Sequence, residues 1–150
     1  MGAIRPWTVI AKVAKMPPPV AVAVLGGPGS GKSYVLDSSN RVLNDACRHF
    51  RLVDSDFEKA GMERGWNESD LDFHARSVAI ARATLRDAVK DRRRIYLSGL
   101  SSDPWKSAIV LSALVGAGYA CYAVVLDVSR STARKRSMAR LNPYMRADTV

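Results

Sequence analysis

The stretch Val20-Ala-Val-Ala-Val-Leu-Gly-Gly-Pro-Gly-Ser-Gly-Lys-Ser33 decides the fold of this chain. A short apolar run leads directly into the pattern Gly-x-x-x-x-Gly-Lys-Ser at residues 26–33. The spacing predicts a buried strand, a tight glycine-rich turn, and a helix whose free N–H groups point at an anion. This is the phosphate-binding loop pattern, so we expect a nucleoside triphosphate to bind here.

Each position of the loop has an expected task. Successive backbone amides form a concave nest for the phosphates, Lys32 reaches the β- and γ-phosphates, and the Ser33 hydroxyl can ligate Mg²⁺. We expect the nucleotide to be ATP or GTP. The sequence does not choose between the two, because no motif that reads the base is visible. We expect the nucleotide to contact the whole segment, namely Gly26, Gly27, Pro28, Gly29, Ser30, Gly31, Lys32, Ser33 and Tyr34.

Length and composition predict one globular domain. The chain has 150 residues, of which 47% are hydrophobic and 25% charged. We expect residues 1–19 to be an arm with a Pro-rich spacer and residues 20–150 to form the domain, which is short at its C-terminus. No apolar run approaches the roughly 20 residues that span a bilayer, and no signal-peptide pattern is present. These features favour a soluble, cytoplasmic protein, and Cys47 and Cys121 suggest neither a disulfide nor a zinc site.

The chain is strongly basic, with a formal net charge of +9. Such a charge favours phosphorylated or polyanionic partners. A basic cluster falls at Arg82, Arg86, Lys90, Arg92, Arg93 and Arg94. It is either a solvated helix face or a surface that docks nucleic acid.

Two carboxylates follow the next short strand. The run at residues 50–53 is followed by Asp54 and Asp56. Ligands bind at the carboxyl ends of parallel strands, so these residues are candidates for Mg²⁺ binding and catalysis. The alternative is that one of them caps the next turn. Residues 57–67 are expected to form a loop or lid.

The remaining pattern alternates helices and strands. We expect a long amphipathic helix at 68–91, capped by Asn67 or Ser69, with its face at Leu71, Ala75, Val78, Ala79, Ala81, Ala83, Leu85 and Val89. His74 lies in it and is expected to be structural or exposed. Next we expect a strand at 95–97 and a helix at 104–115. The last expected strand lies at 119–126 and should be buried on both faces. Ser98 stands where many phosphate-loop enzymes place a Mg²⁺-binding acid.

Five segments together resemble the zeta-toxin group of phosphate-loop kinases, which is similar to polynucleotide-kinase-like phosphotransferases. They lie at residues 26–33, 53–57 (Val-Asp-Ser-Asp-Phe), 97–100 (Leu-Ser-Gly-Leu), 118–119 and 139–146 (Ala-Arg-Leu-Asn-Pro-Tyr-Met-Arg). The resemblance implies a P-loop NTPase three-layer α/β/α sandwich whose parallel sheet has the order 2-3-1-4. It implies that Asp56 is the catalytic base and that Arg136 or Arg140, with Arg146, neutralises the transferred phosphoryl group.

The implied function is a magnesium-dependent kinase that moves the γ-phosphoryl group of ATP or GTP to a hydroxyl. Zeta toxins phosphorylate a UDP-linked amino sugar through a Glu-Gly-Thr element, and this chain has Ser98-Gly99-Leu100 there. Two substrate or metal contacts of the family are thus absent. The resemblance implies a small molecule or a nucleotide sugar as the acceptor. The alternative acceptor is a 5′-hydroxyl or a hydroxymethylated base of nucleic acid. A third reading is a nucleotide-binding module without catalysis.

Overall fold

A parallel four-stranded sheet forms the centre of the computed structural model, which describes residues 6–35, 50–98 and 104–141. The strands are β1 (Val20–Leu25), β2 (Phe50–Val53), β3 (Arg94–Leu97) and β4 (Ala120–Val125), in the order β2-β3-β1-β4. Every pairing is parallel. The expected fold class and strand order are thus confirmed.

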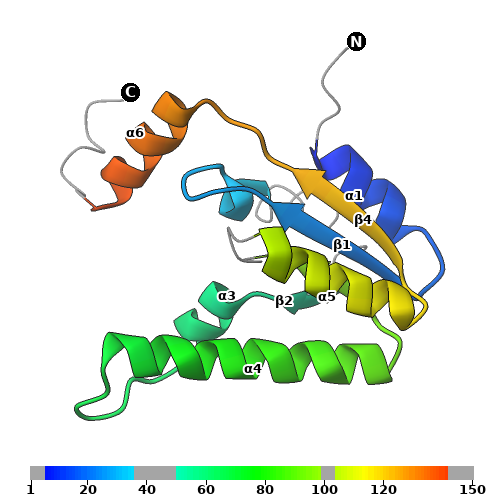
Figure 1. Ribbon diagram of the computed structural model, residues 1–150, viewed down its shortest axis with the longest axis horizontal. Coiled ribbons are helices and arrows are strands. Elements are labelled where there is room, and N and C mark those ends of the chain that lie inside the picture. Colours follow the sequence, from blue (N-terminus) through cyan, green and yellow to red (C-terminus); the bar gives the residue numbers. More distant parts are fainter. Residues whose placement is uncertain (1–5, 36–49, 99–103, 142–150) are drawn as a thin grey trace.

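The two faces of β1 anchor two separate parts of the core. Val20, Val22 and Val24 pack on one face with Ile10 and Val13 of helix α1 (Pro6–Ala14). The alternate residues of β1, which point to the opposite face, pack with residues of helices α4 (Asp70–Lys90) and α5 (Pro104–Gly116). Helices therefore cover both faces of the sheet (Figure 1), and the helical part of the N-terminal arm belongs to the core.

Helix α3 (Ser55–Ala60) begins directly after β2 because Asp54 caps it. Asp54 Oδ1 accepts hydrogen bonds from the backbone N–H groups of Asp56 at 2.8 Å and Phe57 at 3.3 Å. The expectation of a loop from residue 57 was therefore wrong as far as Ala60, since a capped turn is enough to start a helix. Ser69 caps α4, as expected.

The buried face of α4 agrees only in part with the predicted one, which included Ala81. Its buried residues are Ser77, Ala81, Thr84 and Ala88, whereas Leu71 is 76% exposed. Small side chains let the helix lie close to the sheet, and the Ser77 hydroxyl is satisfied by donating to the His74 carbonyl oxygen at 2.7 Å. The apolar pattern therefore identified Ala81, Leu85 and Val89 correctly, but it missed the small polar residues and wrongly included Leu71.

Strand β4 is not buried on both faces, contrary to expectation. Ala120 and Ala123 are exposed, and Val125 is 67% exposed. The reason is position, because β4 lies at the edge of the sheet and pairs only with β1 among the described strands. After it the chain crosses to helix α6 (Arg130–Leu141), which lies beside the phosphate loop (Figure 1).

Several expectations fall outside the described residues. They concern the helix beyond residue 35, Cys47, Gly99, Leu100 and Arg146, together with the side chain of Arg140. Within the described part of the chain, no helix is both long and apolar enough to cross a bilayer.

Candidate active site

The phosphate loop has the backbone geometry that its glycines predict. Gly29 and Gly31 have φ angles of 74° and 94°, in the region that glycine enters without strain. The Ser30 amide donates to the Gly27 carbonyl oxygen at 3.2 Å, and helical structure starts at residue 32. The Lys32 ammonium group donates to the carbonyl oxygens of Gly26 and Gly27, the latter at 3.0 Å. The lysine thus lies along the loop that it is expected to serve.

Helix α6 packs directly on this loop. A Cβ atom added to Gly29 would overlap the Ala133 carbonyl oxygen and lie 2.9 Å from Ser137 Oγ. The Arg136 guanidinium group lies 3.5 Å from the Gly29 carbonyl oxygen. A residue 107 positions further along the chain therefore reaches the predicted phosphate site. Arg136 and Lys32 bring two cations to one loop from two different elements.

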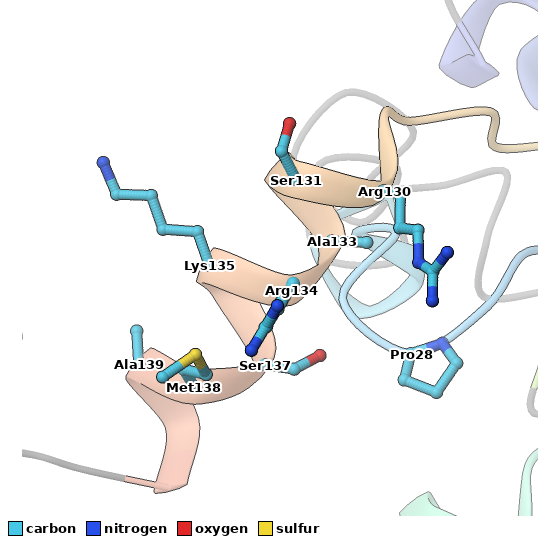
Figure 2. Close-up of a pocket in the computed structure, with 9 residues that line it drawn as sticks. All are labelled: Pro28, Arg130, Ser131, Ala133, Arg134, Lys135, Ser137, Met138 and Ala139. Atoms are coloured by element: carbon cyan, nitrogen blue, oxygen red, sulfur yellow. The ribbon is translucent and has the colours of Figure 1, made fainter.

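A cavity of about 830 Å³ lies along α6, and Pro28 of the loop is the one residue of its described lining that does not belong to the helix. Pro28 forms its loop side, and Arg130, Ala133 and Ser137 lie on the side of α6 toward the loop (Figure 2). Ser131 and Lys135 project from the opposite side of the helix (Figure 2). The volume falls within the range of small-molecule sites.

A second cavity, of about 360 Å³, lies at the carboxyl ends of β2 and β3 between α4 and α5. Its floor includes the buried side chains of Val53, Ala81 and Leu97. Its polar and charged lining comes from five different elements or their ends, with Asp54, Ser55, His74, Arg82, Ser98 and Lys106 contributing. The arrangement is an apolar floor under a charged rim.

Helix α5 connects the second cavity to the phosphate loop. Lys106 and Val110 line the cavity, whereas the neighbouring Ser107 and Leu111 line another hollow with Gly26 and Gly27 of the loop. The first turns of α5 therefore contribute side chains both to the second cavity and to the hollow beside the phosphate loop.

The two candidate carboxylates occupy different places. Asp54 is half-buried, caps α3 and lines the second cavity. Asp56 lies in the first turn of α3 and is exposed. Ser33 and Tyr34 are also exposed, at the start of the helix after the loop. The structure thus brings Asp54 to the cavity, whereas Asp56 is exposed and is not part of the cavity's described lining.

Sequence reasoning missed Lys106 and assigned Arg82 only to a surface cluster. A signal for Lys106 was present, because Asp103-Pro104 predicts a helix start at the carboxyl end of β3. A basic residue in that first turn must lie near the ligand-binding edge of the sheet. His74, expected to be structural or exposed, is an exposed residue of the cavity rim.

The oxygen donors present suit Mg²⁺, which prefers hard oxygen ligands and shares them with substrate phosphates. Both cap hydrogen bonds of Asp54 are accepted by Oδ1. The Ser33 hydroxyl is the second candidate ligand. Across residues 6–35, 50–98 and 104–141, no cluster of three or more His, Cys, Asp or Glu side chains is grouped for a metal.

Comparisons with known proteins agree with this picture. A family model described as an AAA domain matches residues 22–149. Among solved structures, a protein of Chloroflexus aurantiacus described as a putative kinase has a TM-score of 0.63 and 18% identity, over 87% of this chain and 70% of that one. No curated protein matches the chain.

Two further structures share the fold. A chain of the Pnkp1/Rnl/Hen1 complex has a TM-score of 0.52 and 18% identity, over 81% of this chain and 40% of that one. A chain of the PezAT toxin-antitoxin system of Streptococcus pneumoniae has a TM-score of 0.58 and 13% identity, over 95% and 62%. These neighbours share the fold that the resemblance to the zeta-toxin and polynucleotide-kinase-like group implied. This chain spans less than two thirds of the length of the Pnkp1/Rnl/Hen1 chain and of the PezAT chain.

Proposed function

The chain belongs to the AAA domain family that its residues 22–149 match, and from that membership we propose that it transfers the γ-phosphoryl group of ATP or GTP to a hydroxyl acceptor. One observation carries the proposal. The phosphate loop holds Lys32, receives Arg136 from α6, and lies beside the first turns of α5, which also line a cavity that can hold an acceptor. Phosphoryl transfer needs such positioning and charge neutralisation more than covalent chemistry.

In the proposed reaction the acceptor oxygen attacks the γ-phosphorus. The new P–O bond forms as the bond from the γ-phosphorus to its bridging oxygen breaks, and the nucleoside diphosphate leaves. The hydroxyl proton passes to the Asp56 carboxylate. Lys32 and Arg136 balance the charge on the phosphoryl oxygens, and we propose the same task for Arg140 and Arg146.

Ser33 and Asp54 are the residues that would hold Mg²⁺. The ion, when bound, supplies positive charge to the phosphates and fixes their orientation. Asp54 has a second task independent of the metal, since it starts α3 and thereby positions Asp56 two residues later.

The acceptor is proposed to be a small molecule or a nucleotide sugar, as the resemblance to zeta toxins implies. The alternative, a hydroxyl of nucleic acid, is favoured by Arg82, Arg86 and Lys90, which recur every four residues on α4 and so share one side of the helix. The fold shared with a chain of the Pnkp1/Rnl/Hen1 complex agrees with that alternative.

The test is transfer of labelled γ-phosphate from ATP and GTP, with Mg²⁺, to a panel of nucleotide sugars, hydroxylated metabolites and DNA. Lys32→Ala should abolish transfer, and Asp56→Asn should slow it by about 10²–10⁴-fold, as expected for loss of a general base. Asp87→Asn, which removes an exposed carboxylate of α4, is the matched control and should retain the parent rate. Transfer by Asp56→Asn at the parent rate would contradict the assigned base. Nucleotide binding without transfer to any acceptor would favour a non-catalytic module.

A further inference from the structure

The cavity between α4 and α5 is lined by more basic than acidic side chains. Arg82 and Lys106 both line it, and they come from the two helices that form its opposite walls. Asp54 is the one carboxylate in the lining that the structure describes, so the rim carries an excess of positive charge. Neither cation has an ion-pair partner among the described residues.

Two cations on the rim of one small cavity create a positive potential there, which favours an anion bound between them. A phosphate group, with up to two negative charges and three acceptor oxygens, can bind a guanidinium group and an ammonium group together. His74 on the same rim can donate a further hydrogen bond. The apolar floor of Val53, Ala81 and Leu97 suits the uncharged body of such a molecule.

We propose that this cavity binds a small acceptor that carries a phosphate group in addition to its reacting hydroxyl, and that Arg82 and Lys106 bind that phosphate. This inference rests on the proposed phosphotransfer and names the acceptor class for it. A volume of about 360 Å³ is near the lower end for ligand sites and fits a sugar phosphate.

The helix offers an internal control. Arg86 lies four residues after Arg82, one turn further along α4 and about 6 Å away along the axis, but it does not line the cavity. Both arginines are exposed. A small phosphate-bearing ligand should therefore need Arg82 and not Arg86, whereas a nucleic-acid strand should use the whole row of Arg82, Arg86 and Lys90.

The experiment is an NMR titration of the ¹⁵N-labelled full chain with ribose 5-phosphate, with ribose as the uncharged partner probe. We expect ribose 5-phosphate to shift the signals of residues lining the α4–α5 cavity, and Arg82→Gln and Lys106→Gln each to weaken its binding about tenfold. Arg86→Gln should leave the affinity unchanged. No nucleotide is present, so the result does not depend on whether the chain transfers phosphate.

Three outcomes would overturn the inference. The first is ribose shifting the cavity signals at the same concentration as ribose 5-phosphate, or neither probe shifting them. The second is Arg86→Gln weakening ribose 5-phosphate as much as Arg82→Gln does. The third is a short oligo(dT) binding more tightly than ribose 5-phosphate, with equal losses in Arg82→Gln and Arg86→Gln, which would replace the small acceptor with a strand. Thermal unfolding of each variant at the parent temperature confirms that only binding has changed.

Discussion

The phosphate loop and the α4–α5 cavity are built in opposite ways. The loop comes from one continuous segment, residues 26–33, whose glycines and lysine define it before any long-range contact is made. The cavity is assembled from β2, α3, α4, β3 and α5. A site of the first kind can be read from a sequence, whereas a site of the second kind depends on how the elements pack.

The loop nevertheless depends on one long-range contact, the packing of α6 against Gly29. Disrupting this contact should have the largest effect on stability. Gly29→Ala would force alanine into the left-handed backbone region, since residue 29 has a φ angle of 74°. Its new methyl group would also overlap the Ala133 carbonyl oxygen of α6. We expect a loss of about 2–4 kcal/mol in the free energy of unfolding, measured by urea denaturation, together with weaker ATP binding.

Gly27→Ala is the matched control, because a Cβ atom there meets nothing within 4 Å and the residue has no positive φ. It should unfold at nearly the parent urea concentration. Equal losses for the two variants would show that the contact between α6 and the loop does not exist in solution.

The cavity should respond to a change far from its rim. The Tyr119 hydroxyl lies 3.1 Å from the carbonyl oxygens of Ala88 and Arg93, at the C-terminal end of α4, and burial raises its pKa. Tyr119→Phe removes the hydroxyl donor, while the Ala88 carbonyl oxygen still accepts from the Arg93 backbone N–H at 2.9 Å. The loss should therefore be about 1–1.5 kcal/mol in urea denaturation. Because α4 is a wall of the cavity and not of the loop, ribose 5-phosphate binding should weaken more than ATP binding. The reverse order would contradict the separation of the two sites.

The smallest effect on stability is expected at Asp54, which is both the N-cap of α3 and a candidate Mg²⁺ ligand. Asp54→Ala removes the cap of α3 and should cost about 1 kcal/mol in the free energy of unfolding. Asp54→Asn keeps a capping side chain and removes the charge, so stability should return to nearly the parent value. If Asp54 also binds Mg²⁺, transfer by Asp54→Asn should need more Mg²⁺ to reach half its maximal rate. An unchanged Mg²⁺ requirement would limit Asp54 to its structural task.

The same contrast explains how much the sequence could predict. The loop, the strand order and the Ser69 cap were predictable because they depend on local patterns or on the resemblance that those patterns carry. The buried stripe of α4 was not, because close packing selects Ser77 and Ala88 over Leu71. The exposure of β4 was missed because its apolar residues alone predicted burial, although the expected order 2-3-1-4 already placed this strand at an edge. Lys106 joined the site only when α5 was placed beside β3.

The most direct test of the account is calorimetric titration of ATP and GTP, with and without Mg²⁺, into the parent chain and Lys32→Ala. The account predicts saturable binding of at least one nucleotide to the parent, tighter with Mg²⁺, and a loss of tenfold or more in affinity on substitution of Lys32, as estimated from about 1.4 kcal/mol or more for a charged contact. No binding by the parent, or equal affinity in Lys32→Ala, would contradict the claim that residues 26–33 form a nucleotide site.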